Sequence, residues 1–345
     1  MCPEKGETIA FNFLRQTSFV CSGDLLRLLD YLSDWRATDT IAKVLQGYSD
    51  DDIRECLNAL VEMGGVVVQG SAEHEAEARK VEKWEWGIPS AMLHYCEQNR
   101  RFVSRNEAET IQMERAKERP EVDLYTLNTR YDEVTPFPSP LGKKSVLDLM
   151  ARRRTVREVE QVAIAQEALS DCLFAGLGIT SQTENCVNRL PLSMTPSGGA
   201  RNPYEGYVYV REVEGLEPGF YHYSAMEHSL GLISRGSIND AAGLVGDQPW
   251  VGTMSAIVFL CADFSRTMWK YQDNNAYRVV LIEAGHIGQN IMLAATEHGL
   301  TACPSAALSH DRIADHLQLD HDLQAPVYAL MIGKPADVSA ISALH

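Results

Sequence analysis

The sequence has no pair of cysteines spaced as Cys-x-x-Cys, the usual sign of a structural zinc site or a redox pair. Its eight cysteines each stand alone in the chain. The histidines His222, His286, His298 and His310 also lack the spacing of a metal-ligand pair such as His-x-x-x-His. We therefore expect no metal site, and we expect the thiols to be reduced and mostly buried.

Long apolar runs are also missing. The longest, such as residues 255–262, are far shorter than the roughly 20 residues that cross a bilayer, so no membrane span is expected. Residues 1–7 are charged and lack the apolar core of a secretion signal. These features predict a cytoplasmic protein.

Basic charge is scarce. The chain has 31 lysines and arginines against 47 acidic residues, a formal net charge of −16. This balance argues against a nucleic-acid partner held by a broad basic surface. The phosphate-binding Walker sequence is absent, and no Gly-x-Gly-x-x-Gly lies between a strand and a helix.

What the sequence does contain is typical of a globular protein of one large or two modest domains. It has 345 residues, of which 45% are hydrophobic and 23% are charged. Three prolines within residues 135–140 disfavour helix and mark a linker. We therefore predict two domains, residues 1–140 and residues 141–345.

The first 70 residues have the pattern of three short helices followed by a strand. Apolar residues at helical spacing predict helices over residues 24–35 and 38–45, and a third helix follows the capping residue Ser49. Residues 66–68, three valines, read as a strand. This is the winged-helix order, whose third helix usually reads DNA. Here that helix has five acidic residues and a lone Arg54, which favours a protein or peptide ligand.

Residues 73–120 are rich in charge and read as helices interrupted near Trp84 and Trp86. We expect the two tryptophans to anchor helices to the second domain, with ligand contact as the alternative. Beyond residue 140, helical and strand patterns alternate. A long helix over residues 276–298 ends before Gly299, a C-cap residue. The alternation predicts an α+β domain, a sheet flanked by helices.

Three segments of the second half carry candidate chemistry. Residues 152–157 hold four arginines in six residues, which a phosphorylated ligand would explain because guanidinium groups bind phosphate bidentately. The alternative is a solvated turn paired to Glu158 and Glu160. Residues 195–203 form a glycine-containing loop whose backbone could approach a ligand closely, or a plain surface turn. Trp269, Lys270 and Tyr271 suggest a base between aromatic side chains, although lysine is more often solvent-facing.

Taken in order, these segments resemble the nitroreductase superfamily of flavin enzymes, and within it the SagB-type dehydrogenases that oxidise thiazoline and oxazoline rings in ribosomal peptides. The resemblance covers about residues 145–336 and implies a mainly antiparallel FMN-binding fold. The segments that carry it are Arg153-Arg154-Thr155-Val156-Arg157, Pro196-Ser197-Gly198-Gly199-Ala200-Arg201, residues 215–223, residues 277–290 and residues 298–304.

The resemblance also implies roles for single residues. Lys270 and Tyr271 match a pair assigned to proton removal. Ala306-Ala307 stands where many members have Glu-Gly or Gly-Gly, which removes a contact used by nicotinamide-dependent members and favours the dehydrogenase branch. The residues implied in FMN binding are Arg153, Arg154, Thr155, Arg157, Pro196, Ser197, Gly198, Arg201, Asn290, Cys303, Pro304, Ala306 and Lys334.

The function implied is an FMN-dependent dehydrogenase that oxidises azoline rings in a precursor peptide, as a homodimer. A cyclodehydratase or another peptide-modifying enzyme is the implied partner, and residues 1–140 resemble, more loosely, the winged-helix elements that bind leader peptides. Two alternatives stay open. One is an NAD(P)H-dependent reductase of nitro, quinone or enone compounds on the same fold, and the other is a flavin-free peptide-binding protein.

Overall fold

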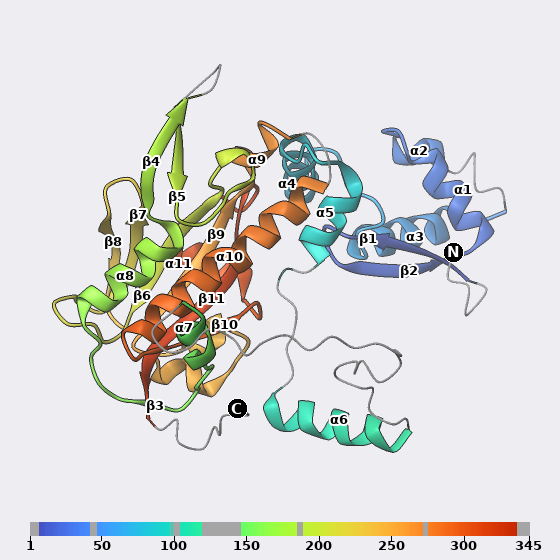
Figure 1. Ribbon diagram of the computed structural model, residues 1–345. Helices are drawn as coiled ribbons and strands as arrows, with labels where there is room; N and C mark the ends of the chain where they lie inside the picture. Colours follow the sequence, from blue (N-terminus) through green and yellow to red (C-terminus); the bar gives the residue numbers. More distant parts are fainter. Residues whose placement is uncertain are drawn as a thin grey trace, which may run out of the picture. The chain divides into compact units, whose positions relative to one another are not determined.

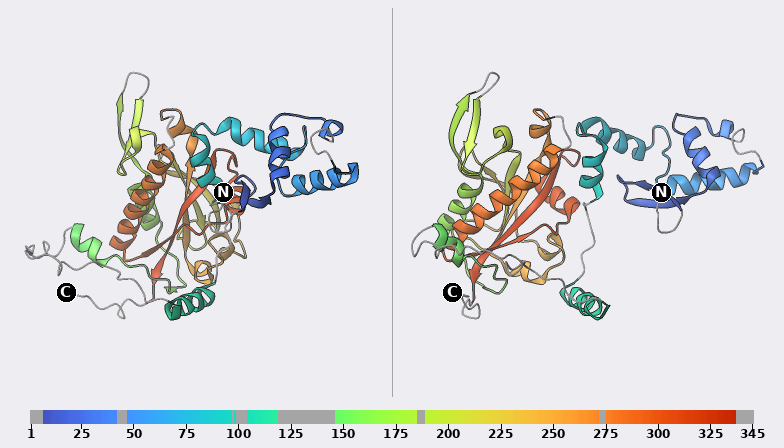
Figure 2. Two further views of the ribbon diagram at one scale, coloured as in Figure 1. Left: turned by 90° about the vertical axis from the view of Figure 1, so that its right-hand side faces the viewer. Right: turned by 45° about the vertical axis from the view of Figure 1, so that its right-hand side comes forward.

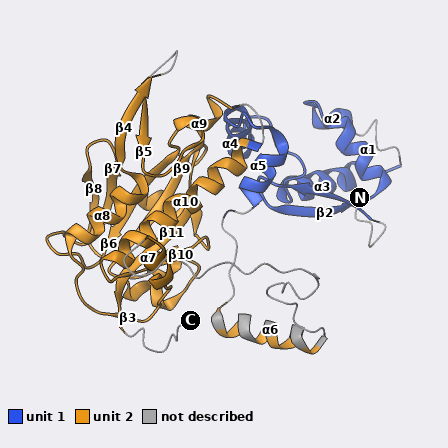
Figure 3. Ribbon diagram, viewed as in Figure 1, with its two compact units in different colours: residues 1–98, 272–275 blue, residues 99–271, 276–345 orange. Residues whose placement is uncertain are grey.

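The computed structural model describes residues 7–41, 47–96, 98, 104–118, 146–184, 189–271 and 275–336. The chain divides into two compact units, which Figure 3 shows in two colours. Unit 1 consists of Met1–Gln98 with Gln272–Asn275, and unit 2 of Asn99–Tyr271 with Ala276–His345. The predicted linker and the boundary at residue 140 lie outside the described residues.

Unit 1 begins with a hairpin and continues as helices (Figure 1). Leu28, Ile41, Ile53 and Leu60 form its small core. The predicted caps are confirmed, since the Ser22 hydroxyl accepts from the Leu25 N–H and Ser49 forms a reciprocal capping box. The elements are β1 (Thr8–Asn12), β2 (Thr17–Cys21), α1 (Gly23–Tyr31), α2 (Thr38–Ile41), α3 (Asp50–Glu62), α4 (Ala72–Lys83) and α5 (Gly87–Cys96).

The strand predicted at residues 66–68 is wrong. The N–H groups of Gly65 and Val66 both donate to the carbonyl of Leu60, at 2.7 and 3.3 Å, and so close α3 in a turn. Val66 then packs against the core of unit 1 from this turn. The apolar side chain of Val66 therefore packs from a loop, and the two strands among the described residues of this unit precede its helices.

Trp84 and Trp86 are both buried, and their rings meet edge to face with centroids 5.6 Å apart. Trp84 also stacks on the ring of His94, which lies on α5, at 4.7 Å. The Trp84 indole N–H donates to the Ser90 hydroxyl at 3.1 Å. Within unit 1 the two tryptophans are thus packing residues. The next helix along the chain is α6 (Arg105–Glu118).

Unit 2 is built on an antiparallel sheet with the strand order β10-β11-β9-β6-β7-β8, and β3 pairs with β11. This confirms the predicted α+β class with a mainly antiparallel sheet. A second, two-stranded sheet of β4 and β5 projects from it (Figure 2). The strands are β3 (Val159–Glu160), β4 (Ile179–Glu184), β5 (Arg189–Ser193), β6 (Tyr204–Val210), β7 (Gly219–Ser224), β8 (Ser229–Arg235), β9 (Ala256–Asp263), β10 (Thr301–Ser305) and β11 (Gln324–Pro335).

Helices cover both faces of the large sheet (Figure 2). On one face, Leu177 of α8 lies over Gly206, and Gly288 of α10 lies over Tyr328, so that a side chain at either glycine would collide. On the other face α11 packs Ile313 and Leu317 into the largest cluster of buried apolar residues. The helices are α7 (Val146–Arg152), α8 (Gln166–Leu177), α9 (Phe264–Met268), α10 (Asn275–Glu297) and α11 (His310–Leu317), with 3-10 turns at Gly198–Ala200, Ala242–Leu244 and Pro249–Thr253.

The long helix α10 is apolar and long enough to cross a membrane by length and composition alone. Half of its most apolar window is buried inside the protein, where Val280, Ile287 and Ile291 pack. Core helices of water-soluble proteins have the same character. Gly299 follows the helix with φ 68°, as its predicted role as a C-cap requires.

Candidate functional site

The arginine-rich segment follows α7 and is bonded to strand β10. The Thr301 hydroxyl accepts from the Val156 N–H at 3.0 Å and donates to the Arg154 carbonyl at 3.2 Å. The Cys303 thiol donates to the Val156 carbonyl at 3.1 Å. Burial raises the pKa of this thiol, so Cys303 serves here as a neutral donor that holds the segment. Two residues of β10 thus fix the backbone from which the arginines project.

Three of the four arginines, Arg153, Arg154 and Arg157, have no carboxylate partner among the described residues. Arg152 pairs with Asp148 and with Glu297, at 3.2 and 3.4 Å. Arg153 reaches the Thr155 hydroxyl at 3.4 Å, and the Arg157 guanidinium lies 5.4 Å from the centre of the Trp250 ring.

The residues near Arg153 and Arg157 in the sequence and in the sheet do not neutralise the charge of these two arginines. Arg154 donates to backbone carbonyls of its own turn. Glu160, a predicted partner of the arginines in the alternative interpretation, instead pairs with Lys334 at 2.8 Å, across the β3–β11 pairing. Pro304 and Ala306 continue the chain from Cys303, with Pro304 partly buried and Ala306 exposed.

The glycine-containing loop is hydrogen-bonded to the buried carboxyl group of Glu283, a residue of α10. Gly198 donates its backbone N–H to Oε2 of Glu283 at 3.2 Å, and the Ser197 side chain also bonds to Glu283. Ser197 in turn accepts from the Asn202 N–H at 2.8 Å, which closes the loop. Burial raises the pKa of Glu283 above its ordinary value, against the lowering effect of the two hydrogen bonds.

Lys270 and Tyr271 lie against this loop. The Lys270 ammonium is 3.5 Å from the carbonyl of Gly199 and 5.3 Å from the centre of the Tyr271 ring. Gly199 has φ 63°, and a Cβ there would collide with the Tyr271 hydroxyl and with Lys270. Lys270 is exposed to solvent, so the described residues do not bury it between aromatic rings. The fold thus brings together the loop and the Lys-Tyr pair, which are separated by 70 residues of sequence.

Asn290 links the loop to two helices. Its amide donates to the Thr195 hydroxyl at 2.9 Å and to the Ala175 carbonyl at 3.2 Å, and Thr195 donates to the Gly176 carbonyl. Asn290 therefore bonds to the residue that precedes Pro196 in the loop. Among the described residues, the Asn290 amide thus holds the loop in place through hydrogen bonds.

The sequence-predicted residues therefore form two groups along α10. The loop, against which the Lys-Tyr pair lies, contacts α10 through Glu283 and Asn290, whereas the arginine segment contacts the end of α10 through the ion pair of Arg152 with Glu297. Residues 283 and 297 are separated by about 21 Å of helix axis.

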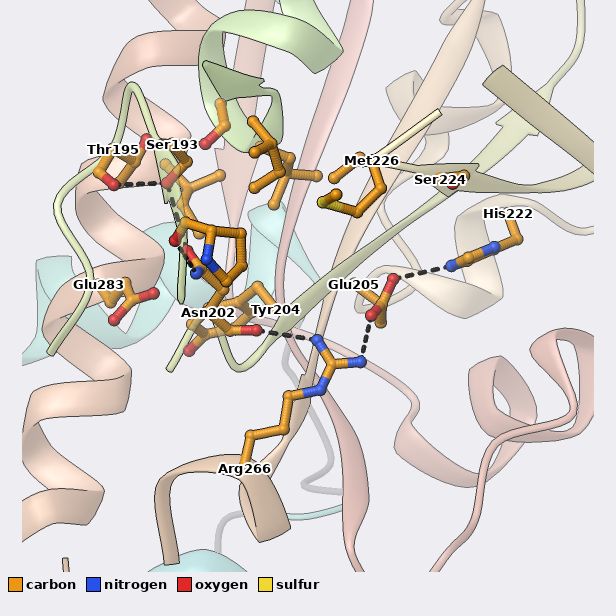
Figure 4. A pocket seen from close by; sticks show the side chains of 16 residues that line it. Ser193, Thr195, Asn202, Tyr204, Glu205, His222, Ser224, Met226, Arg266 and Glu283 are labelled. Carbon is orange, nitrogen blue, oxygen red and sulfur yellow. Dashed lines mark hydrogen bonds and ion pairs between the residues drawn. The ribbon is translucent and has the colours of Figure 1, made fainter. Parts of the chain in front are cut away.

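A polar network that the sequence did not indicate lies behind the loop (Figure 4). Glu205 accepts from His222 at 2.8 Å and forms an ion pair with Arg266, which also donates to the Asn202 carbonyl at 2.9 Å. Burial raises the pKa of Glu205, but the hydrogen bonds of His222 and Arg266 outweigh it and hold the pKa below its ordinary value. The network lines a cavity of about 220 Å³ that also contains Glu283.

The pattern of the nitroreductase family matches residues 150–334, more than half of the chain. A Methanocaldococcus jannaschii protein assigned to the nitroreductases is 30% identical over 188 residues, which cover 54% of this chain and 89% of that protein. The trifolitoxin-processing protein TfxB of Rhizobium leguminosarum bv. trifolii is 23% identical over 309 residues, 84% of this chain and 82% of TfxB. The microcin B17-processing protein McbC of Escherichia coli is 26% identical over 148 residues, 41% of this chain and 54% of McbC.

Among solved structures, the Escherichia coli microcin synthetase McbBCD complex with truncated pro-MccB17 bound contains a chain that is 20% identical. The match covers 68% of this chain and 96% of that one, with a TM-score of 0.46. A nitroreductase-type protein of Desulfovibrio desulfuricans, solved in complex with FMN, is 19% identical over 59% of this chain and 94% of its own, with a TM-score of 0.40.

Proposed function

Because the chain belongs to the nitroreductase family, we propose that it is an FMN-dependent dehydrogenase that matures a ribosomally made peptide. Two of its relatives are named for the processing of trifolitoxin and of microcin B17. The bond proposed to be oxidised is that of an azoline ring, which becomes an azole. The observation that carries the proposal is the packing of Lys270 and Tyr271 against Gly199 of the loop.

The residues present fit the cofactor. Arg153 and Arg157 have no carboxylate partner among the described residues, so their guanidinium groups are available to a phosphate. Thr155 lies between them and offers a hydroxyl. Gly198 and Gly199 have no side chains, which lets a flat ring approach their backbone. FMN has its phosphate and its ring at opposite ends, which agrees with two groups of residues separated along α10.

The remaining residues of the FMN proposal belong to the same two groups. The backbone at Cys303, Pro304 and Ala306 continues from the strand that fixes the arginines. Arg154 and Lys334, whose ion partner is Glu160, are the further basic residues there, and Asn290 holds the loop through Thr195, the residue before Pro196.

Bound FMN would supply the redox chemistry, because its ring accepts a hydride from the substrate carbon. The chain's own part is to hold the peptide and to move a proton. Lys270, as the neutral amine, would take the proton from the carbon beside the ring heteroatom or nitrogen, and the ammonium group formed in this way would lie against the ring of Tyr271. The loop of residues 196–201 would fix the distance between this base and the reacting carbon.

We assign residues 1–140 to holding the leader of the peptide substrate. Unit 1 contains a cavity of about 1060 Å³, lined by β1 and by the segment after α3. β1 pairs only with β2 among the described strands, so its outer edge has free backbone groups beside the cavity. A leader held there would raise the effective concentration of the rest of the peptide at unit 2.

Two partners belong to this proposal. A cyclodehydratase, or another peptide-modifying enzyme, would make the azoline ring before it is oxidised. A second copy of the chain would cover the exposed apolar residues Val279, Leu281 and Ile282 of α10, and the two copies would form a homodimer.

The similarity to the Methanocaldococcus jannaschii protein favours a second candidate, an NAD(P)H-dependent reductase of nitro, quinone or enone compounds. An anaerobic visible spectrum of the purified protein separates the two. We expect a yellow protein that stays oxidised when excess NADPH or NADH is added. Rapid bleaching would show the reductase instead, and a colourless protein that takes up no added FMN would overturn both in favour of a flavin-free binding protein.

A further inference from the structure

A second cavity of unit 2 lies beside the Lys-Tyr pair. Its volume is about 430 Å³. It is lined by residues from β5, from the loop, from α9 and from the position that follows α9. These residues are Pro191, Ala200, Arg201, Asn202, Arg266 and Trp269.

Arg201 brings an unused guanidinium group to this cavity. It lies over the ring of Trp269 at 5.0 Å, which fixes its plane. Its Nε is buried and donates to no atom of the described residues. A buried N–H of a charged group that finds no acceptor is costly, and no carboxylate among the described residues pairs with Arg201, so an anion bound to its guanidinium would be favourable.

The other arginine of the cavity, Arg266, already has acidic and carbonyl partners. Arg266 donates to the Asn202 carbonyl and forms ion pairs with Glu205 and with Asp263. It therefore serves the polar network behind the loop. Arg201 has no such partner among the described residues, although both lie on the wall of one cavity.

The cavity has a positive charge in a chain whose net charge is −16. None of its lining residues is acidic. Lys270 follows Trp269 directly and has its ammonium 3.5 Å from the carbonyl of Gly199. An anion in the cavity would therefore lie next to the residue proposed as the base.

We propose that Arg201 and Trp269 form a subsite for a carboxylate of the peptide substrate. The guanidinium would bind the carboxylate bidentately, and the indole would hold the guanidinium plane in place. The subsite rests on the proposed function for the identity of the peptide as substrate. Under this proposal Arg201 binds the substrate, whereas the family resemblance implied that it binds FMN.

The test uses full-length protein labelled with 5-fluorotryptophan and observed by fluorine NMR. The chain has five tryptophans, and Trp269→Phe assigns the signal of Trp269. The probes are acetyl-Gly-Glu-Gly-amide, acetyl-Gly-Gln-Gly-amide and acetyl-Gly-Gln-Gly with a free C-terminus. We expect the Glu peptide to shift the Trp269 signal at a concentration about tenfold lower than the Gln amide requires, the factor of one charge-assisted hydrogen bond.

The third peptide distinguishes a side-chain carboxylate from a C-terminal one, and preference for either carboxylate peptide supports the subsite. Arg201→Gln should abolish the preference, and Arg201→Lys should restore part of it. Arg189→Gln is the matched control, because Arg189 is an exposed arginine of the neighbouring hairpin and its ion partner is Glu184. This variant should keep the preference of the wild type.

Equal shifts with all three peptides, or a preference that survives in Arg201→Gln, would overturn the subsite. Loss of FMN from purified Arg201→Gln would overturn it too, because Arg201 would then belong to the cofactor. The signal of Trp269 is observed whether or not the protein contains flavin. A colourless protein that takes up no added FMN and still prefers the Glu peptide would therefore refute the proposed function and leave the subsite standing.

Discussion

Glu283, in the middle of α10, accepts a hydrogen bond from the backbone N–H of Gly198 across 85 positions of sequence, at 3.2 Å. Only 5% of Glu283 is exposed, and among the described residues no cation pairs with it. A carboxyl group in this place is costly unless its hydrogen bonds position something. We infer that it positions the loop of residues 196–201, on which the proposed flavin and base contacts depend.

Glu283→Gln should retain FMN, because the amide oxygen still accepts from Gly198, whereas Glu283→Leu should lose it. The flavin absorbance of the two purified variants measures this difference.

The stability of the protein should also depend on pH through Glu283. Burial raises the pKa of Glu283 from its ordinary 4.5, so the folded protein binds the carboxyl proton of Glu283 more tightly than the unfolded chain does. The resulting stability is present below pH 4.5 and is lost as the pH rises through the raised pKa. The Tm of Glu283→Gln relative to wild type should therefore increase with pH. A constant difference between pH 4 and pH 8 would contradict the assignment.

Thr301→Val should loosen the arginine segment. The variant leaves the Val156 N–H without its acceptor inside the protein, which costs about 1–3 kcal/mol of unfolding free energy. We expect the affinity for FMN to fall with it, because the same contact fixes the backbone between Arg154 and Arg157. Thr301→Ser keeps the hydroxyl and serves as the control. Chemical denaturation and flavin titration measure the two effects, and a Val variant with wild-type flavin affinity would separate the segment from the cofactor.

Replacing Arg153 and Arg157 together with Ala should weaken FMN binding on the order of 100-fold or more, since two charge-assisted contacts to a phosphate are lost. Arg152→Ala is the matched control from the same segment, because its exposed ion pairs contribute about 0–1 kcal/mol. Absorbance of the purified proteins at the flavin band gives the result. A double variant that purifies with full FMN would refute the phosphate assignment.

Lys270→Ala should leave FMN bound and reduce turnover of an azoline peptide by about 10²–10⁴-fold, the usual contribution of a general base. Tyr271→Phe should have a smaller effect, because the ring that lies against the ammonium is kept. Single-turnover kinetics with the precursor peptide would measure both. Normal turnover of Lys270→Ala would remove this residue from the mechanism.

Gly199→Ala should disturb the Lys-Tyr pair without touching its residues. A Cβ at this position would collide with Tyr271 and Lys270, and its φ of 63° costs a non-glycine residue about 1–2 kcal/mol. A displaced base should lower turnover by about 10–100-fold while FMN is retained. Gly252→Ala, where an added Cβ meets nothing within 4 Å, is the control. Equal turnover in the two variants would show that the loop does not position the base.

The sequence predicted best what depends on neighbouring residues. The caps at Ser22 and Ser49 and the end of α10 at Gly299 follow from local hydrogen bonding and from the freedom of glycine. The strand at residues 66–68 failed because valines favour both strands and buried loops, and only the turn after α3 decides between them. The β4–β5 hairpin was not predicted, because its strands are largely polar and its pairing is set by the fold.

The sequence indicated the segments that form the candidate site but not the residues that hold these segments in position. Family resemblance pointed to Ser197, Lys270 and Arg153, and the fold places each in one of two groups. The residues beneath them were missed, because Glu205 and His222 lie in ordinary strand patterns and form a network only when β6 and β7 pair. A signal did exist for Glu283, an acidic residue among the apolar residues of the buried face of α10.

A single uninterrupted helix, α10, joins Glu283 beneath the loop to Glu297 beside the arginine segment. Inserting one residue between them would turn everything beyond it by about 100° and move Glu297 away from Arg152. Inserting seven would nearly restore the direction but would lengthen the separation by about 10 Å. The length of this helix therefore sets the distance between the two residue groups, and relatives that bind the proposed cofactor in the same way should tolerate substitutions here but neither insertions nor deletions.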